Sequence, residues 1–200
     1  MKRLLSLMCV AMLTIAASAQ ITWNVKAGIG FVSMYGKDTK NFDSHLGAKA
    51  GVGIEVPISS DFSVMPSVEA AFKGFENSYN FANSQAVGNG KETCDLLYVQ
   101  IPVLLAYRIH LADAWNIAVK AGPYFGYCVY DHYKMKDSTQ DVGGSGKLDI
   151  NKFDAGLDLG LDFEYHRFVF GAELEWGFVS LVDNGTAKNF AVYGTIGYKF

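Results

Sequence analysis

The chain has 200 residues, enough for one domain, and its 50% hydrophobic and 14% aromatic content excludes a disordered chain. Its 21 glycines and 18% charged residues favour many short strands over a helical bundle, in which glycine is costly. The net charge of -3 leaves no basic excess to neutralise a run of phosphates, so we expect no nucleic-acid partner.

The first predicted element in chain order is a secretory signal peptide. Two basic residues precede an apolar run over residues 4–15, and the small residues Ala17-Ser18-Ala19 follow it. The run is shorter than the roughly 20 apolar residues that a membrane-spanning helix needs. We therefore predict cleavage after Ala19, a signal peptide over residues 1–19 and one outer-membrane β-barrel domain over residues 20–200.

Strand-like alternation of apolar with small or polar residues recurs through the rest of the chain. In the second segment, for example, Leu46, Ala48 and Ala50 alternate with Gly47 and Lys49. Period-two alternation is the signature of a strand with two unlike faces. We predict eight strands, over residues 23–31, 46–56, 62–75, 96–109, 115–130, 152–165, 168–181 and 190–200.

The connections between these strands alternate between long, polar segments and short turns. The long ones cover residues 35–45, 76–95, 131–151 and 182–189, and the short ones cover residues 57–61, 110–114 and 166–167. Bacterial outer-membrane barrels have short periplasmic turns and longer extracellular loops. The sequence therefore predicts an all-β fold, an eight-stranded antiparallel up-and-down transmembrane β-barrel, with both termini in the periplasm.

The apolar face of the strands carries the bulky side chains, which argues against a soluble barrel such as a lipocalin. In the fourth strand every second residue from Leu97 to Ile109 is apolar. About 13 residues tilted near 45° span roughly the 25 Å apolar band of such barrels. The opposite faces are rich in glycine and charge, so we expect lipid outside the barrel and a narrow polar lumen inside it.

Six basic and eight acidic residues fall on the lumen-facing side of these strands. A charge in a confined site is costly unless it is paired or hydrated, so the mixed signs favour a cross-lumen salt-bridge network over a pore that selects one ion sign. The predicted network comprises Lys26, Lys49, Glu55, Glu69, Lys73, Arg108, Lys120, Asp154, Asp158, Asp162, Glu164, Glu173, Glu175 and Lys199.

Cys94 and Cys128 are the cysteines of the mature chain, because Cys9 lies within the predicted leader. Two cysteines do not make a disulfide scaffold. They lie at similar distances from the turn near residue 112 and share inward parity, so one hypothesis is a disulfide at the outer rim. The alternative is two free thiols, because cross-strand bridges need particular geometry.

Four segments of the chain carry a resemblance to a known protein family. They are the leader ending at Ala19-Gln20 and residues 98–105, 121–127 and 197–200. They resemble the small porin-like outer-membrane β-barrel family of Gram-negative bacteria, and the resemblance covers the whole mature chain. It implies that the barrel-assembly machinery reads the aromatic residue at the end of the last strand, Phe200. Members of this family share a fold while their roles differ, so the fold does not supply the function.

Three functional hypotheses follow from the residues. The first, which we favour, is a non-enzymatic barrel with a structural or surface-binding role through the long loops over residues 76–95 and 131–151, since binding on a rigid barrel usually resides in loops. The second is a narrow porin-like channel for small solutes or ions. The third is a lipid-modifying enzyme or protease that uses Asp131, His132 and Ser138, a set whose geometry the sequence does not fix.

The sequence contains no metal-binding pattern, so we expect no cofactor and no catalytic residues. Its four histidines fall in predicted loops or turns and lack the spacing of a metal site: His45, His110, His132 and His166. The expected partners are outer-membrane lipid, the barrel-assembly machinery and a surface ligand or envelope protein.

Overall fold

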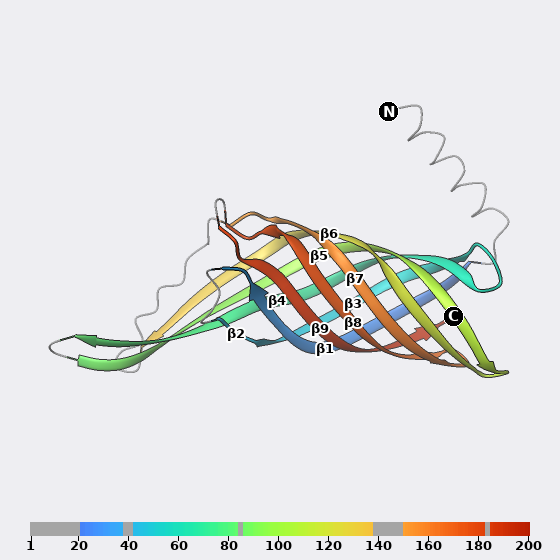
Figure 1. Cartoon of the computed structure of the whole chain (residues 1–200), viewed down its shortest axis with the longest axis horizontal. Coiled ribbons are helices and arrows are strands. Elements are labelled where there is room, and N and C mark those ends of the chain that lie inside the picture. The colour runs from blue at the N-terminus through green and yellow to red at the C-terminus, as the bar shows by residue number, and fades with distance from the viewer. Residues whose placement is uncertain (1–20, 38–41, 84–85, 138–149, 183–184) are drawn as a thin grey trace, which may run out of the picture.

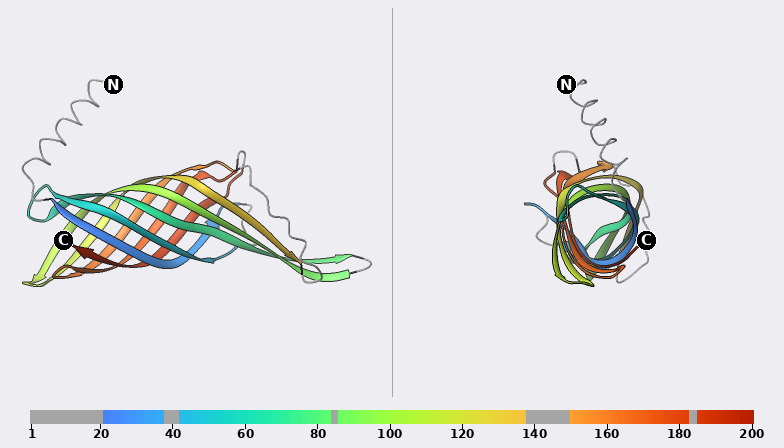
Figure 2. Two further views of the ribbon diagram at one scale, coloured as in Figure 1. Left: turned by 180° about the vertical axis from the view of Figure 1, so that it is seen from behind. Right: turned by 90° about the vertical axis from the view of Figure 1, so that its right-hand side faces the viewer.

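The computed structural model describes residues 21–37, 42–83, 86–137, 150–182 and 185–200, so the predicted signal peptide lies outside the described part. Eight long antiparallel strands form a closed barrel, which the end-on view in Figure 2 shows as a ring. They are β1 (Thr22–Tyr35), β3 (His45–Pro57), β4 (Phe62–Asn83), β5 (Ala86–Ala112), β6 (Trp115–Asp137), β7 (Phe153–Tyr165), β8 (Phe168–Ser180) and β9 (Lys188–Lys199), with a short β2 (Phe42–Asp43) beside β4. No helix among the described residues is long and apolar enough to cross a membrane.

The strands follow one another around the ring, and the predicted fold class is confirmed. Each long strand pairs with its neighbour in the sequence, β4 pairs with β5, and β1 closes the ring against β9. The closing seam runs from Asn24 opposite Lys199 to Tyr35 opposite Lys188. Because every long strand has two partners, the barrel wall has no open edge.

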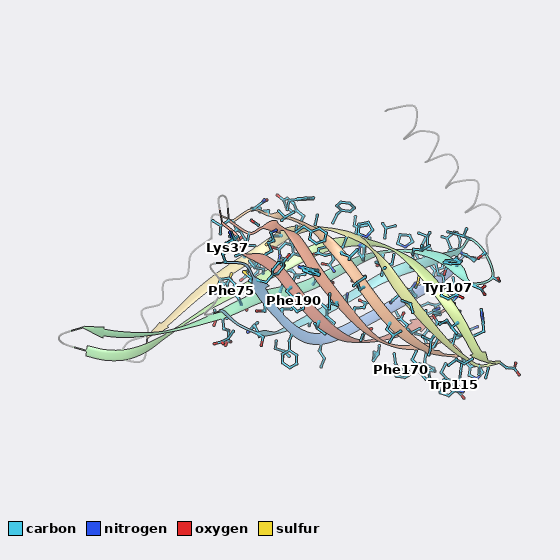
Figure 3. The ribbon with its side chains drawn as sticks, viewed as in Figure 1. Lys37, Phe75, Tyr107, Trp115, Phe170 and Phe190 are labelled. Carbon is cyan, nitrogen blue, oxygen red and sulfur yellow. The ribbon has the colours of Figure 1, made fainter. Side chains whose placement is uncertain are left out.

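The two faces of the wall differ as the alternation predicts. On β1, Phe31 is 66% exposed on the outside, while the next residue, Val32, is 1% exposed and faces the lumen. Large apolar side chains cover the outer surface, as the sticks around the ribbon in Figure 3 show. Buried charged, tyrosine and small residues occupy the inner face. The barrel therefore presents an apolar surface to lipid and keeps its polar groups inside.

The two ends of the barrel are unlike. One end, which we call the turn end, carries three short turns over residues 58–61, 113–114 and 166–167, together with the start of β1 and the end of β9. Its tightest turns have two residues, and His166 adopts a left-handed backbone with φ of 52° to make one of them. Such a conformation is normal in two-residue hairpins between twisted strands.

At the other end three adjacent strands continue beyond the rest of the barrel. We call residues 76–83, 86–95 and 131–137 the arm; Figure 1 shows it projecting from β4, β5 and β6. The prediction of loops over residues 76–95 and 131–151 is wrong for these positions, because they pair as strands, with Tyr79 opposite Gly90 and Gly90 opposite Asp137. Residues 84–85 and 138–149 lie outside the described part.

Candidate functional site

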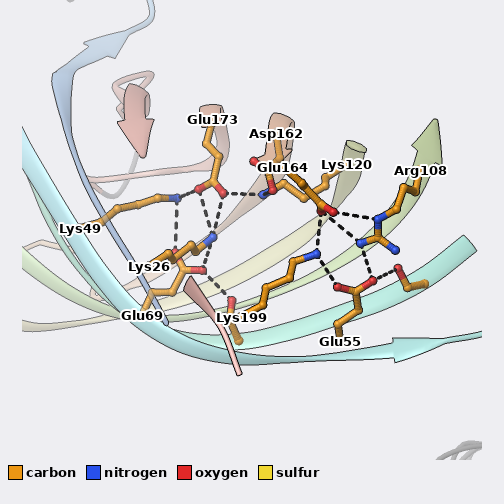
Figure 4. A network of polar contacts seen from close by, with 12 residues as sticks. Lys26, Lys49, Glu55, Glu69, Arg108, Lys120, Asp162, Glu164, Glu173 and Lys199 are labelled. Carbon is orange, nitrogen blue, oxygen red and sulfur yellow. Dashed lines mark hydrogen bonds and ion pairs between the residues drawn. The ribbon is translucent and has the colours of Figure 1, made fainter. Parts of the chain in front are cut away.

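A carboxylate on β8 lies at the centre of the charged lumen. Lys26 Nζ lies 2.9 Å from Glu173 Oε1, Lys120 Nζ lies 3.0 Å from the same oxygen, and Lys49 also contacts this carboxylate. The three lysines come from β1, β6 and β3, so their long side chains converge across the lumen (Figure 4). Glu69 of β4 lies 2.7 Å from Lys26 Nζ and accompanies this cluster. One buried carboxylate therefore links strands from around the whole ring.

A second cluster lies at the turn end, where two cations and two anions alternate. Arg108 contacts Glu55 at 2.6 Å and Glu164 at 3.0 Å, and Lys199 contacts the same two carboxylates at 2.8 and 2.7 Å. Each charge thus has two partners of opposite sign, as the right-hand part of Figure 4 shows. The Ser63 hydroxyl donates a further hydrogen bond to Glu55 at 2.8 Å. This cluster is electrically balanced.

A third cluster lies toward the arm and uses aromatic rings as well as charges. Lys73 Nζ lies 2.7 Å from Glu175 and 4.5 Å from the centre of the Tyr124 ring, a cation–π geometry. Asp154 accepts hydrogen bonds from the Tyr124 hydroxyl at 3.0 Å and from the Asn189 amide at 2.9 Å. Polar side chains that carry no charge therefore add hydrogen bonds to the buried ions of this cluster.

Beyond this third cluster the lumen is closed by apolar side chains. The buried group consists of Met34, Cys94, Leu96, Tyr98, Cys128 and Leu181. Nearer the Glu173 cluster, a cavity of about 30 Å³ remains beside Lys26, Lys120 and Asp162. A space of this size holds about two water molecules. A larger hollow of about 370 Å³ lies at the turn end, beside Glu55, Arg108, Glu164 and Lys199. The interior between this hollow and the apolar group is therefore packed with side chains.

The structure brings thirteen of the fourteen predicted network residues into ion pairs. Asp158 is the exception: it is fully buried, and neither of its carboxylate oxygens has a hydrogen-bond partner among the described residues. Prediction from charge alone also missed the neutral members Ser63, Gln100, Tyr124 and Asn189. These four residues lie at alternate strand positions on the lumen-facing side, the same side as the charged residues, and this spacing could have identified them.

The base of the arm has its own polar contacts. His45, at the start of β3, has Nδ1 3.1 Å from Glu76 on β4 and Nε2 3.4 Å from Asp95 on β5. The short strand β2 pairs with β4 at the same level, with Asp43 opposite Glu76. These contacts fix the point at which the arm leaves the barrel. The sequence placed His45 in a loop and gave no sign of this role.

The two cysteines are free thiols in the structure, and the predicted disulfide is absent from it. The turn between β5 and β6 lies at residues 113–114, farther along the chain from Cys94 than from Cys128, so Cys94 lies opposite Tyr133 and Cys128 lies opposite Tyr98. The bulge between Leu97 and Tyr98 adds one residue to this offset, and the two cysteines are not cross-strand partners. Both thiols are buried in the apolar group at the arm end.

The hydrolytic set considered from the sequence is not assembled by the described residues. Asp131 and His132 are consecutive on β6, and consecutive strand residues point to opposite faces of a sheet. Ser138 lies outside the described part. The described residues include no group of His, Cys, Asp and Glu side chains that could hold a metal ion.

Comparison with known proteins gives a family and a set of similar structures. The family model "Outer membrane protein beta-barrel domain" matches residues 16–183. The structure of Ail, the attachment invasion locus protein of Yersinia pestis, is 16% identical with a TM-score of 0.43, over 90% of this chain and 98% of that one. Neisserial surface protein A is 11% identical with a TM-score of 0.45, over 89% and 97% of the two chains. No curated protein matches this sequence.

Proposed function

Because this chain belongs to the outer membrane protein β-barrel domain family, we propose that it is a non-enzymatic surface-binding protein whose arm binds an extended segment of another protein. The observation that carries this proposal is strand length. β4, β5 and β6 have 22, 27 and 23 residues, whereas the other five long strands have 12 to 14. Among the described residues, the wall is extended on one side only, at β4, β5 and β6. Connecting these strands by short loops would not require such an extension.

The arm has the geometry of a sheet with two edges. Residues 78–83 of β4 and 133–137 of β6 each pair with β5 on one side and have no second partner strand among the described residues. The outer N–H and C=O groups of such a strand are available to an added strand. An extended peptide that joins a sheet edge gains a row of backbone hydrogen bonds. The arm therefore suits a partner that offers an extended segment.

The barrel itself supports the arm and leaves little room for transport. The side chains of Tyr98, Tyr124 and Tyr193 are fully buried inside it, and the ion pairs fill the space between them. Eight strands leave an interior just wide enough for side chains. A packed lumen favours surface binding over the alternative of a narrow solute or ion channel.

We also propose that the chain is exported with cleavage after Ala19 and that the assembly machinery recognises its last strand at Phe200. The Phe200 amide donates to the carbonyl of Trp23 at 2.8 Å, and its ring lies 5.2 Å from that of Tyr198 on the outer surface. The aromatic end of the strand is thus displayed at the turn end. A mature mass that includes residues before Gln20 would contradict the cleavage site.

An arm deletion tests the binding proposal. Asn77 lies opposite Glu92, so residues 78–91 can be replaced by an Asn-Gly turn that closes a two-residue hairpin. The matched control replaces the two-residue turn Asp113-Ala114 at the opposite end by the same Asn-Gly pair. A phage-displayed library of random peptides is selected on the wild-type barrel in lipid nanodiscs.

We expect the selected peptides to bind the wild type and the control equally and to bind the arm deletion at least about tenfold more weakly, a loss of about 1.4 kcal/mol. Two results would contradict the proposal. One is equal binding to the deletion, and the other is no enrichment over empty nanodiscs. A heat-modifiability gel establishes that each variant is folded.

A further inference from the structure

Two adjoining hollows lie on the lipid-facing surface of β7, β8, β9 and β1. The first has a volume of about 370 Å³ and is lined by Ala27, Phe168, Phe170, Ile196 and Tyr198. The second has a volume of about 510 Å³, lies on the other side of Phe170 and Ile196, and includes Ala172 and Gly194. Figure 3 shows Phe170 pointing away from the barrel. The two hollows together form one interrupted groove.

Gly194 gives the groove its depth. A β-carbon built at this position would meet no heavy atom closer than 3.9 Å, the oxygen of Ile29. The residue pairs with Ala172 on β8 and with Ile29 on β1, so the surface is low between larger neighbours. A glycine in a strand loses packing and conformational entropy, and here no close backbone contact calls for one. The absence of a side chain at Gly194 therefore deepens the groove and is not required by the packing of the barrel wall.

A fixed positive charge lies where the groove reaches the turn end. Arg167 is exposed in the turn between β7 and β8, and it is the one basic residue in the three turns over residues 58–61, 113–114 and 166–167. The other two turns carry Asp61 and Asp113. The Arg167 carbonyl accepts a hydrogen bond from the Lys199 amide at 2.8 Å, which holds the turn against the end of β9. Among the three turns, the positive charge of a Lys or Arg side chain therefore lies only on the β7–β8 hairpin, which borders the groove.

The separation of charge and groove matches one lipid molecule. Ala172 lies five residues beyond Arg167, about 17 Å along the strand at 3.3 Å per residue and about 12 Å in depth at a strand tilt near 45°. This depth is close to half of the roughly 25 Å apolar band of such barrels. Phe168 and Tyr198, whose rings are 5.3 Å apart, lie between them at the level expected for the interfacial aromatic belt.

We propose that this groove and Arg167 form a binding site for one anionic phospholipid in the inner leaflet of the outer membrane. An acyl chain lies along the hollows on either side of Phe170 and Ile196. The phosphate lies at the hairpin, where the guanidinium can donate two parallel hydrogen bonds to its oxygens. A second barrel that packed its own apolar face here would not need the positive charge.

Native mass spectrometry of the delipidated barrel in non-ionic detergent tests this site. The probes are phosphatidylglycerol and phosphatidylcholine with identical acyl chains. We expect the wild type to retain one phosphatidylglycerol with a preference of about fivefold over phosphatidylcholine, the size expected for one basic residue near an anionic headgroup. Arg167→Gln abolishes the preference. Lys152→Gln, which removes one positive charge from an exposed side chain at the arm end, retains it.

A second pair of variants tests the groove. Gly194→Leu places a side chain in the hollow, with its β-carbon 3.9 Å from the nearest backbone atom, and lowers the retention of both lipids by about fivefold or more. Ala70→Leu, on the exposed face of β4, leaves retention unchanged. Equal retention by Gly194→Leu and the wild type would overturn the proposal. A dimer without retained lipid, dissociated by Gly194→Leu, would assign the groove to a second copy of the chain instead.

Discussion

Glu55 of β3 and Lys199 of β9 lie 144 residues apart in the sequence, and their side chains meet inside the barrel at 2.8 Å. Arg108 of β5 and Glu164 of β7 complete this cluster, so four alternate strands of the ring are joined through their side chains. Backbone pairing alone connects only neighbouring strands. The lumen contacts therefore couple parts of the wall that the sheet itself does not, which favours a rigid barrel.

Removing the charge of Glu173 should destabilise the barrel strongly. Glu173→Gln leaves Lys26, Lys49 and Lys120 without their shared carboxylate, and breaking a buried ion pair from one side costs about 3–5 kcal/mol. The measurement is urea-induced unfolding in lipid vesicles, followed by tryptophan fluorescence.

The matched variant is Asp158→Asn on the neighbouring strand. Asp158 is equally buried but has no ion-pair partner among the described residues, so replacing it separates no salt bridge. We expect a change below about 1 kcal/mol, because an unpaired buried charge is itself unfavourable. Equal losses in the two variants would show that the ion pairs around Glu173 contribute nothing specific.

Two glycines near the closing seam should respond oppositely to an added methyl group. At Gly30 a β-carbon would overlap the carbonyl oxygen of Val192 on the partner strand, whereas at Gly194 it would meet only ordinary contacts. Gly30→Ala should therefore lower the unfolding free energy by about 1–3 kcal/mol, as overpacking does. Gly194→Ala should leave it within about 0.5 kcal/mol. The same vesicle unfolding experiment measures both, and a tolerant Gly30 would argue against this close approach of β1 and β9.

The arm should loosen at its base when His45 is replaced. His45→Ala removes the contacts with Glu76 and Asp95, and partly exposed ion pairs contribute about 0.2–1 kcal/mol. We expect hydrogen exchange of amides 74–77 and 92–95 to accelerate by up to about fivefold. His110→Ala is the control, because its contact with Asp61 lies at the turn end. Faster arm exchange in the control would show that the effect is not local.

Both thiols should be unreactive in the folded barrel. Cys94 and Cys128 are free and at most 2% exposed, and a buried thiol is shielded from reagents. A maleimide should label neither in the native protein and both after unfolding without reductant. Non-reducing mass spectrometry that finds the mature chain two hydrogens lighter would establish a disulfide, contrary to the structure.

The positions of the strands were predictable because lipid imposes a strict rule. A wall between lipid and a narrow lumen must alternate apolar with small or polar residues, and the predicted second, sixth and seventh segments match β3, β7 and β8 within one residue at each end. Outside the membrane no such alternation is required. Residues 76–95 are polar and contain the turn-like Gly88-Asn89-Gly90, so their pairing in the arm was not readable.

The members of the lumen network were predictable, but their partners were not. Parity places Lys26 and Glu173 on the inner face, yet their contact depends on the stagger of strands around the whole ring. The cysteines show the same limit, since the turn at residues 113–114 puts Cys128 opposite Tyr98 and not opposite Cys94. Neither the stagger nor the exact position of this turn has a sequence signal of its own here.

The claim that the lumen is packed and the arm carries the function is tested most directly by planar-bilayer recording of the purified wild-type barrel. The buried ion pairs and the apolar group at the arm end predict a membrane that stays electrically silent at moderate voltage. Folding of the same preparation is established by heat modifiability. Steady, reproducible conductance steps from folded protein would contradict the account and favour a channel.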